Sequence, residues 1–166
     1  MKLHDKIVLV TGGSRGIGKA ISKLFVEEGA HVIITSKNIT KLEETAKEIN
    51  CSFFIDADIK SEKDVNNAIN KIIEKFGRID ILINNAGILP EQKKLDQINE
   101  NDWNEVLDVD LTGQFRFTKA VIPHMKKNGG SIINMSSDAG LKTFENFYAD
   151  AYVASKAAII MLTKSW

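Results

Sequence analysis

Residues 7–20 read IVLVTGGSRGIGKA, an apolar run that leads directly into a glycine-rich turn. Gly12, Gly16 and Gly18 place three glycines within seven residues, and a backbone without Cβ atoms can approach phosphate oxygens closely. A helical pattern from Ile17 to Glu28 follows, and the positive end of a helix dipole favours a pyrophosphate. The stretch therefore predicts a phosphate-binding loop, with an ordinary turn as the alternative.

The spacing of this loop narrows the choice of ligand. An ATP-binding loop, G-x-x-x-x-G-K-[ST], needs a magnesium-binding hydroxyl at the position that Ala20 occupies. The dinucleotide fingerprint G-x-G-x-x-G also fails, because its third glycine would fall on Ile21. What fits is the looser spacing Thr11-Gly12-x-x-x-Gly16-x-Gly18, and a P-loop kinase or ATPase is disfavoured.

Strand-like and helix-like segments alternate along the whole chain. The apolar, β-rich runs lie at 6–11, 31–35, 52–56, 79–84 and 131–135. The helical patterns lie at 17–28, 39–49, 61–77, 102–127 and from 150 onward. Continuous apolar runs are typical of parallel strands that are covered on both faces. We therefore expect residues 1–166 to form one α/β domain, a doubly wound Rossmann-type parallel sheet with helices on both faces.

The last helical pattern reaches Trp166 without a glycine, asparagine or proline to end it. The six-stranded arrangement of this architecture would need another strand after it. The sequence thus predicts a C-terminally incomplete domain that lacks its last strands. In such a chain the run 131–135 would form an exposed sheet edge, and we expect marginal stability and weak catalysis.

Composition excludes several classes of protein. Of the 166 residues, 43% are hydrophobic, and 22 Lys and Arg balance 22 Asp and Glu, so no global charge favours nucleic acid or an anionic membrane. The N-terminal apolar run is too short for a signal peptide, and no stretch could span a bilayer. The single cysteine, Cys51, excludes an internal disulfide and suits a reducing compartment. These features predict a cytoplasmic protein without nucleic-acid or membrane partners.

The end of the second predicted strand bears on the cofactor. NAD-binding folds place a carboxylate there for the ribose hydroxyls, but the chain reads Thr35-Ser36-Lys37-Asn38. Lys37 and Arg15 would instead attract the 2′-phosphate of NADP. We expect NADP(H) to be preferred and NAD(H) to remain possible, with a solvated Lys37 as the alternative.

Tyr152 and Lys156 are four residues apart on a predicted helix, so they share one face. A cation beside a phenol stabilises the phenolate, which makes a tyrosine a usable acid and base near neutral pH. On its own this Y-x-x-x-K spacing is weak evidence, because such pairs are common on helices.

In order along the chain, these motifs resemble the short-chain dehydrogenase/reductase family, and the 3-oxoacyl-carrier-protein reductase branch most of all. The resemblance runs from Lys6 to Trp166 and also includes Asn84-Asn85-Ala86-Gly87 and the segment Ile133–Ser137. It implies hydride transfer between the nicotinamide of NAD(P)(H) and a small carbonyl compound or secondary alcohol, with no metal; the end of the second strand favours NADP(H) for this role. By this resemblance Ser137 bonds the substrate oxygen, Tyr152 exchanges the proton, and Lys156 holds the ribose and supports the tyrosine. The implied cofactor-binding residues are Gly12, Ser14, Arg15, Gly16, Ile17, Gly18, Lys37, Asp58, Ile59, Asn85, Ala86, Gly87, Tyr152 and Lys156.

Rivals exist for two of the catalytic positions. Ser136 neighbours Ser137, and Tyr148 lies near Tyr152 but has no lysine four residues later. The interval from Ser137 to Tyr152 is also longer than the family's usual one, which indicates an insertion in 141–149.

Asp110 is a departure from the family, many members of which carry asparagine here. It follows Val106 by one helical turn on an apolar face, where a carboxylate is costly unless paired or protonated. We expect Lys156 to be its partner and count Asp110 among the catalytic candidates, with a solvated surface residue as the alternative.

The last two predicted helices are expected to pair copies of the chain into a homodimer or homotetramer. Their contact residues are predicted to be Ala151, Ala154, Ala157, Ala158, Phe115, Phe117 and Met125. The alternative function is a truncated, non-catalytic protein that keeps a nucleotide site or an assembly surface.

Overall fold

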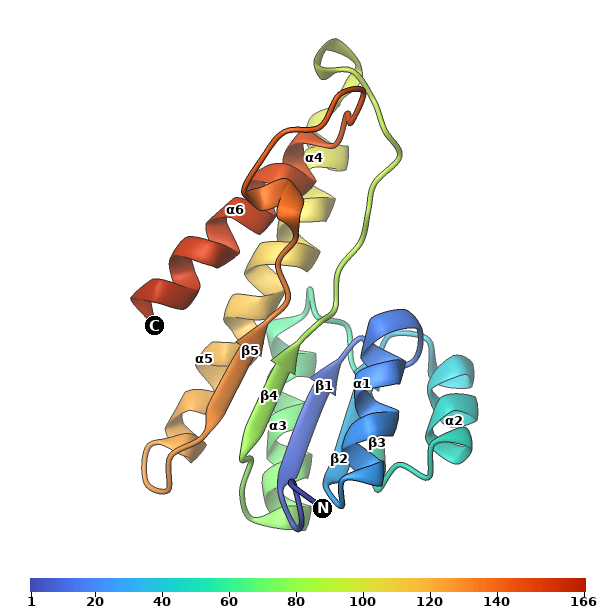
Figure 1. Ribbon diagram of the computed structural model, residues 1–166, viewed down its shortest axis with the longest axis vertical. Helices are drawn as coiled ribbons and strands as arrows, with labels where there is room; N and C mark the ends of the chain where they lie inside the picture. The colour runs from blue at the N-terminus through green and yellow to red at the C-terminus, as the bar shows by residue number, and fades with distance from the viewer.

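A computed structural model describes residues 1–166 and contains a five-stranded parallel sheet with the strand order β3-β2-β1-β4-β5 (Figure 1). The strands are β1 (Ile7–Thr11), β2 (His31–Ser36), β3 (Phe53–Asp56), β4 (Ile81–Asn84) and β5 (Ser131–Asn134). The α-helices are α1 (Gly16–Glu27), α2 (Ile39–Glu48), α3 (Glu62–Phe76), α4 (Glu100–Leu107), α5 (Gly113–Met125) and α6 (Asp150–Ser165). Because the strand order reverses between β1 and β4, the doubly wound fold is confirmed and a ligand crevice is expected there.

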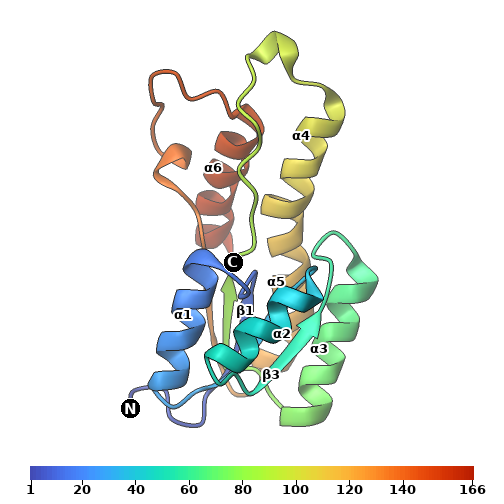
Figure 2. The ribbon, with the colours of Figure 1, turned by 90° about the vertical axis from the view of Figure 1, so that its right-hand side faces the viewer.

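Two apolar layers cover the sheet, and β1 contributes to both. Ile7 and Leu9 belong to the larger cluster, which α3 and α5 complete. Val8 and Val10 point the other way and pack with residues of β2 and α2. Figure 2 shows α1 on one side of the sheet and α3 and α5 on the other. Coverage of both faces explains why the central strands are continuously apolar.

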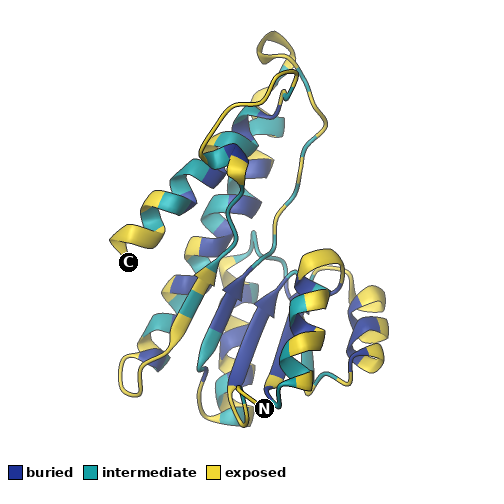
Figure 3. Ribbon diagram, in the orientation of Figure 1, coloured by how far each residue is buried: buried dark blue, intermediate teal, exposed yellow.

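The strand β5 lies at one edge of the sheet and differs from β1 in its exposure (Figure 3). All five residues of β1 are buried, whereas none of the four residues of β5 is, and Ile133 is 47% exposed. The edge position of this strand agrees with the sequence prediction.

The prediction of one uninterrupted helix over 102–127 is wrong, because a π-helical turn interrupts it. Between α4 and α5 the chain forms a π-helical turn, η2 (Asp108–Thr112), in which the Gly113 N–H donates to the Asp108 carbonyl. Gly113 also allows close packing, since a Cβ there would lie 2.4 Å from Cγ1 of Ile59. Such π turns are often found at functional sites.

The helix expected at 61–77 is confirmed, and side-chain and backbone signals mark both of its ends. The Ser61 side chain accepts a hydrogen bond from the Asp64 N–H and caps α3, and Gly77 ends this helix with a left-handed φ of 76°. The Asp64 carboxylate, however, accepts from the Asp58 N–H at 3.4 Å instead of returning to Ser61. The start of α3 therefore helps to fix the segment after β3.

The expected assembly surface is wrong in part. Phe117 and Met125 are buried in the core between the sheet and the helices, and Ala151 on α6 is also buried within the chain. Phe115 and Met161 remain exposed on α5 and α6, at 45% and 63%. No helix has both the length and the apolar character needed to cross a bilayer.

Candidate active site

Hydrogen bonds of Thr11, at the end of β1, and of Asn85, just after β4, join the carboxyl ends of these two strands. The Thr11 hydroxyl accepts from the N–H groups of Asn85 and Ala86, both at 3.0 Å. The Asn85 side chain donates to the carbonyls of Thr11 and Gly12, at 3.0 and 3.3 Å. These bonds hold the glycine-rich loop against the loop after β4.

Gly18 is the glycine that the close approach of these loops requires. A Cβ at Gly18 would lie 2.4 Å from both Nδ2 of Asn85 and the Gly12 carbonyl oxygen. Gly12 itself has a φ of 65°, a conformation that other residues rarely adopt. The loop therefore keeps its shape only with glycine at these two positions.

The first turn of α1 is suited to an anion. Arg15 is its N-cap residue, no side chain caps the helix, and its first turn contains no acidic residue. The helix N-terminus thus carries free N–H groups and the positive end of the dipole, and these face the loop.

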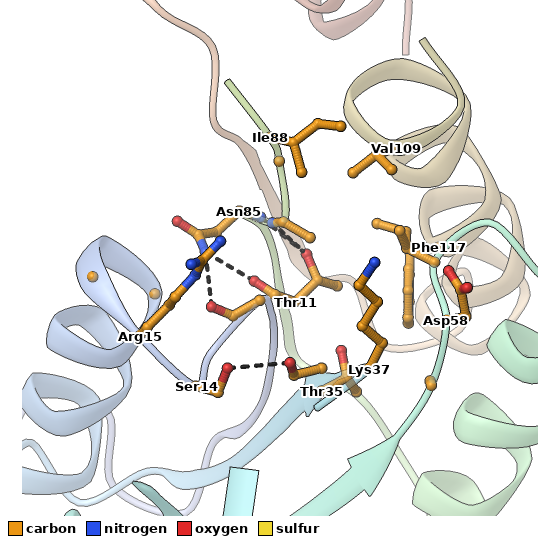
Figure 4. Close-up of a pocket in the computed structure, with 18 of the residues that line it drawn as sticks. Thr11, Ser14, Arg15, Thr35, Lys37, Asp58, Asn85, Ile88, Val109 and Phe117 are labelled. Atoms are coloured by element: carbon orange, nitrogen blue, oxygen red, sulfur yellow. Dashed lines mark hydrogen bonds between the residues drawn. The ribbon is translucent and has the colours of Figure 1, made fainter. Parts of the chain in front are cut away.

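A cavity of about 310 Å³ opens at this crevice (Figure 4). Every residue predicted to bind the cofactor, except Tyr152 and Lys156, lines it: Gly12, Ser14, Arg15, Gly16, Ile17, Gly18, Lys37, Asp58, Ile59, Asn85, Ala86 and Gly87. Three cations line the cavity: Arg15, the N-cap residue of α1, Lys37 after β2, and Lys60, which pairs with Glu105 at 3.7 Å. The Ser14 hydroxyl donates to Oγ of Ser36 at 3.1 Å, which links the loop to the end of β2.

Lys156 and Asp110 form a buried ion pair beside the cavity. Nζ of Lys156 lies 3.2 Å from Oδ2 of Asp110, and both side chains are at least 95% buried. Lys156 also donates to the Met135 carbonyl at 3.2 Å, and Oδ1 of Asp110 accepts from the Ile88 N–H at 2.7 Å. Burial raises the pKa of the Asp110 carboxyl, and the attraction of Lys156 offsets this only in part. A solvated Asp110 is thereby excluded.

Gly87 separates this ion pair from the cavity. A Cβ at Gly87 would lie 3.1 Å from Oδ2 of Asp110 and 3.4 Å from Nζ of Lys156. The pair is thus one residue away from the crevice at the sheet switch point. On its other side, Nζ of Lys156 lies 5.3 Å from the ring centre of Tyr152.

The side chain of Ser137 is engaged in local hydrogen bonds. Its side chain accepts from the Ala139 N–H and donates to Oδ1 of Asp138, both at 3.2 Å, and so caps the short 3-10 helix η3 (Asp138–Gly140). No hydrogen bond joins Ser137 to Tyr152 or Lys156. The rival Ser136 faces α6, where its hydroxyl donates to the Lys156 carbonyl at 2.7 Å.

Sequence reasoning missed two polar residues that support the site. Thr11 begins the glycine motif, and its hydroxyl also holds the loop after β4. Gln114 is fully buried, and its amide donates to the same Met135 carbonyl that accepts from Lys156. A polar residue one turn after Asp110 on a buried helix was the available signal for Gln114.

The family model for short chain dehydrogenases matches residues 6–166. The chain belongs to this family. A 3-oxoacyl-[acyl-carrier-protein] reductase of Thermotoga maritima is 39% identical over all of this chain and 68% of its own length. An L-fucose dehydrogenase of Bos taurus is 36% identical over 96% of this chain and 58% of its own length. A crystal structure of a short chain dehydrogenase from Mycobacterium smegmatis is 31% identical, with a TM-score of 0.93 over 99% of this chain and 70% of that one.

This member of the family therefore spans between about half and two thirds of the length of the curated relatives it matches. The two relatives are named for different substrates, a sugar and an acyl group on a carrier protein. Family membership thus supports nicotinamide-dependent redox chemistry as a class and leaves the substrate open.

The raised pKa of Asp110 gives a prediction about stability and pH. An unfolded aspartate titrates near pH 3.9, so the folded chain holds this proton more tightly. The stabilisation from Asp110 is then present below about pH 4 and is lost as the pH rises through the raised pKa. Urea unfolding between about pH 4 and 7 should show wild type losing stability relative to Asp110→Asn as the pH increases.

Asp108→Asn is the matched control, because it removes one negative charge from the same turn at a more exposed position. A constant difference between wild type and Asp110→Asn, or the opposite trend, would show that burial does not dominate at Asp110.

Proposed function

We propose that this chain is an NADP(H)-dependent oxidoreductase that transfers a hydride between the cofactor and a carbonyl compound or secondary alcohol. The observation that carries the proposal is that the glycine loop, Arg15 and Lys37 line one crevice, and that the Lys156–Asp110 pair lies directly behind Gly87 of this crevice and beside Tyr152.

The residues at the crevice fit a dinucleotide phosphate. Gly12 and Gly18 form a cradle that a Cβ would fill, and the uncapped start of α1 offers N–H groups to a pyrophosphate. Lys37 and Arg15 would hold the 2′-phosphate, and Asp58 and Ile59 would hold the adenine end. When bound, the cofactor supplies the hydride for reduction or accepts it in oxidation.

The chain's own groups would manage the proton and the substrate oxygen. In reduction, the Tyr152 phenol donates its proton to the carbonyl oxygen, and Lys156 stabilises the phenolate that results. The Ser137 hydroxyl would exchange its local bond to Asp138 for one to the substrate oxygen. Asp110 would act as a positioning residue, because its ion pair holds the Lys156 ammonium.

Cofactor preference tests the first half of the proposal. We expect fluorescence titration to show tighter binding of NADPH than of NADH, because Lys37 and Arg15 favour a phosphate. Lys37→Asp should erase or reverse a gap of about tenfold, which corresponds to about 1.4 kcal/mol. Lys41→Asp is the control, since it makes the same change nearby outside the cavity. Equal affinities in the wild type would overturn the preference.

Loss of the Tyr152 hydroxyl tests the second half. Tyr152→Phe keeps the ring but removes the proton, so carbonyl reduction should fall by about a hundredfold or more. NADPH affinity should change little. Tyr148→Phe is the control, because the Tyr148 hydroxyl contacts only Asn146. Cofactor binding without any turnover in the wild type would favour the non-catalytic alternative.

We also propose a homodimer or homotetramer that pairs through α5 and α6. The exposed Phe115 and Met161 on these helices support this, since both would be covered in a pair. Light scattering at micromolar concentration should give a multiple of the monomer mass, and Met161→Glu should lower it. Leu24→Glu, at an exposed position on α1, is the control. A wild-type monomer would contradict the proposal.

A further inference from the structure

The loop 141–149 carries two phenylalanines on one tight turn. The Phe147 N–H bonds to the Phe144 carbonyl at 3.4 Å, and Asn146 between them has a φ of 58°. The first and last residues of such a turn lie close together, so their side chains can meet. Their ring centres are 6.1 Å apart in an edge-to-face arrangement.

The Phe147 ring also contacts Tyr152, the proposed catalytic residue. The ring centre of Phe147 lies 6.3 Å from that of Tyr152, again edge to face. This contact is not the usual hydrophobic staple of a helix start, which would join Tyr148 to Val153 on α6. The start of α6 therefore does not by itself explain why Phe147 packs against Tyr152.

Hydrogen bonds from a second loop hold this turn in place. The Tyr148 N–H donates to Oε1 of Gln92 at 3.2 Å, and the Lys93 N–H donates to the Tyr148 carbonyl at 3.1 Å. Nζ of Lys93 is in turn held by Asp102 at 2.7 Å. The rings are thus fixed beside Tyr152 by the segment that follows β4 and the cofactor crevice.

Of the two phenylalanine rings, only the outer one, Phe144, has a cation against its face, and exposed apolar side chains lie on the same loops. Phe147 is half-buried, and Phe144, which is 40% exposed, is the ring that Nζ of Lys142 approaches to 4.9 Å. Leu89 and Leu141 lie on the same two loops and are 60% and 75% exposed. Solvent-exposed apolar groups on held loops beside a reactive residue are typical of a binding wall.

We propose that Phe147, together with Phe144, forms the substrate wall of this site, and that the substrate carries an aryl or hydrocarbon group next to its carbonyl. The inference rests on the proposed function for the role of Tyr152. Phe147 would be a specificity-determining residue, and a small polyhydroxylated ketone would gain less from these rings than an aryl ketone would.

Binding of two ketones tests this without turnover. Saturation-transfer NMR is recorded with 4-phenyl-2-butanone or dihydroxyacetone in the presence of NADP⁺, which cannot reduce a ketone. The wild type should transfer saturation to the phenyl protons and much less to dihydroxyacetone. Phe147→Ala should weaken binding of the aryl ketone about fivefold to tenfold, as expected for the loss of one ring contact. Phe147→Trp should restore it.

Controls separate the possible failures. Leu24→Ala removes an exposed apolar side chain on α1 and should leave binding unchanged. If Phe147→Ala does not fold, Phe144→Ala provides the same comparison on the more exposed ring. Ring-dependent binding without NADPH-driven reduction would reject the proposed function and keep the wall. Equal signals from both ketones, or binding of the aryl ketone that is insensitive to both substitutions, would overturn the inference.

Discussion

The close approach of two loops at the ends of β1 and β4 is the constraint on which the rest of the site depends. The backbone at Gly12 and Gly18 leaves no room for a Cβ, and the Asn85 side chain occupies the space that two such atoms would need. Thr11 and Asn85 replace the sheet's own hydrogen bonds where the strands separate. The crevice is consequently open where the strand order reverses, but its two walls cannot move independently.

A second constraint is the burial of a charge pair. A buried carboxylate and ammonium are each costly to remove from water, and only their mutual attraction and further hydrogen bonds offset that cost. Oδ1 of Asp110 accepts from the Ile88 N–H and Lys156 donates to the Met135 carbonyl, in the segments after β4 and β5, whereas Oδ2 of Asp110 has only the attraction of Lys156. Four separate segments therefore meet at this one pair, and Tyr152 takes its place from the same helix as the lysine.

The fold was predictable because apolar runs and helix ends are local signals. The runs that form β1 and β2 are continuously apolar, as expected for buried parallel strands. Ser61 and Gly77 are residue types that typically begin and end a helix, and they do so in α3. The sequence motifs predicted most of the residues that line the cavity. The position of Asp110 on an apolar helix face predicted its pairing with Lys156. The predictions that failed depend on tertiary packing, because the burial of Phe117 and the π turn are decided by neighbours distant in sequence.

The π turn η2 divides the continuous helical rod that α4 and α5 form. One extra residue in a turn rotates everything after it by about 100° relative to an uninterrupted α-helix. This offset lets α4 pack against α6 while α5 packs against α3, although the two form one continuous rod. A deletion of a single residue in 108–112 would restore regular helical phase, and it would turn one of the two halves away from its neighbours. The π turn thus changes the direction in which the helix surface faces, so that α4 can pack against α6 and α5 against α3.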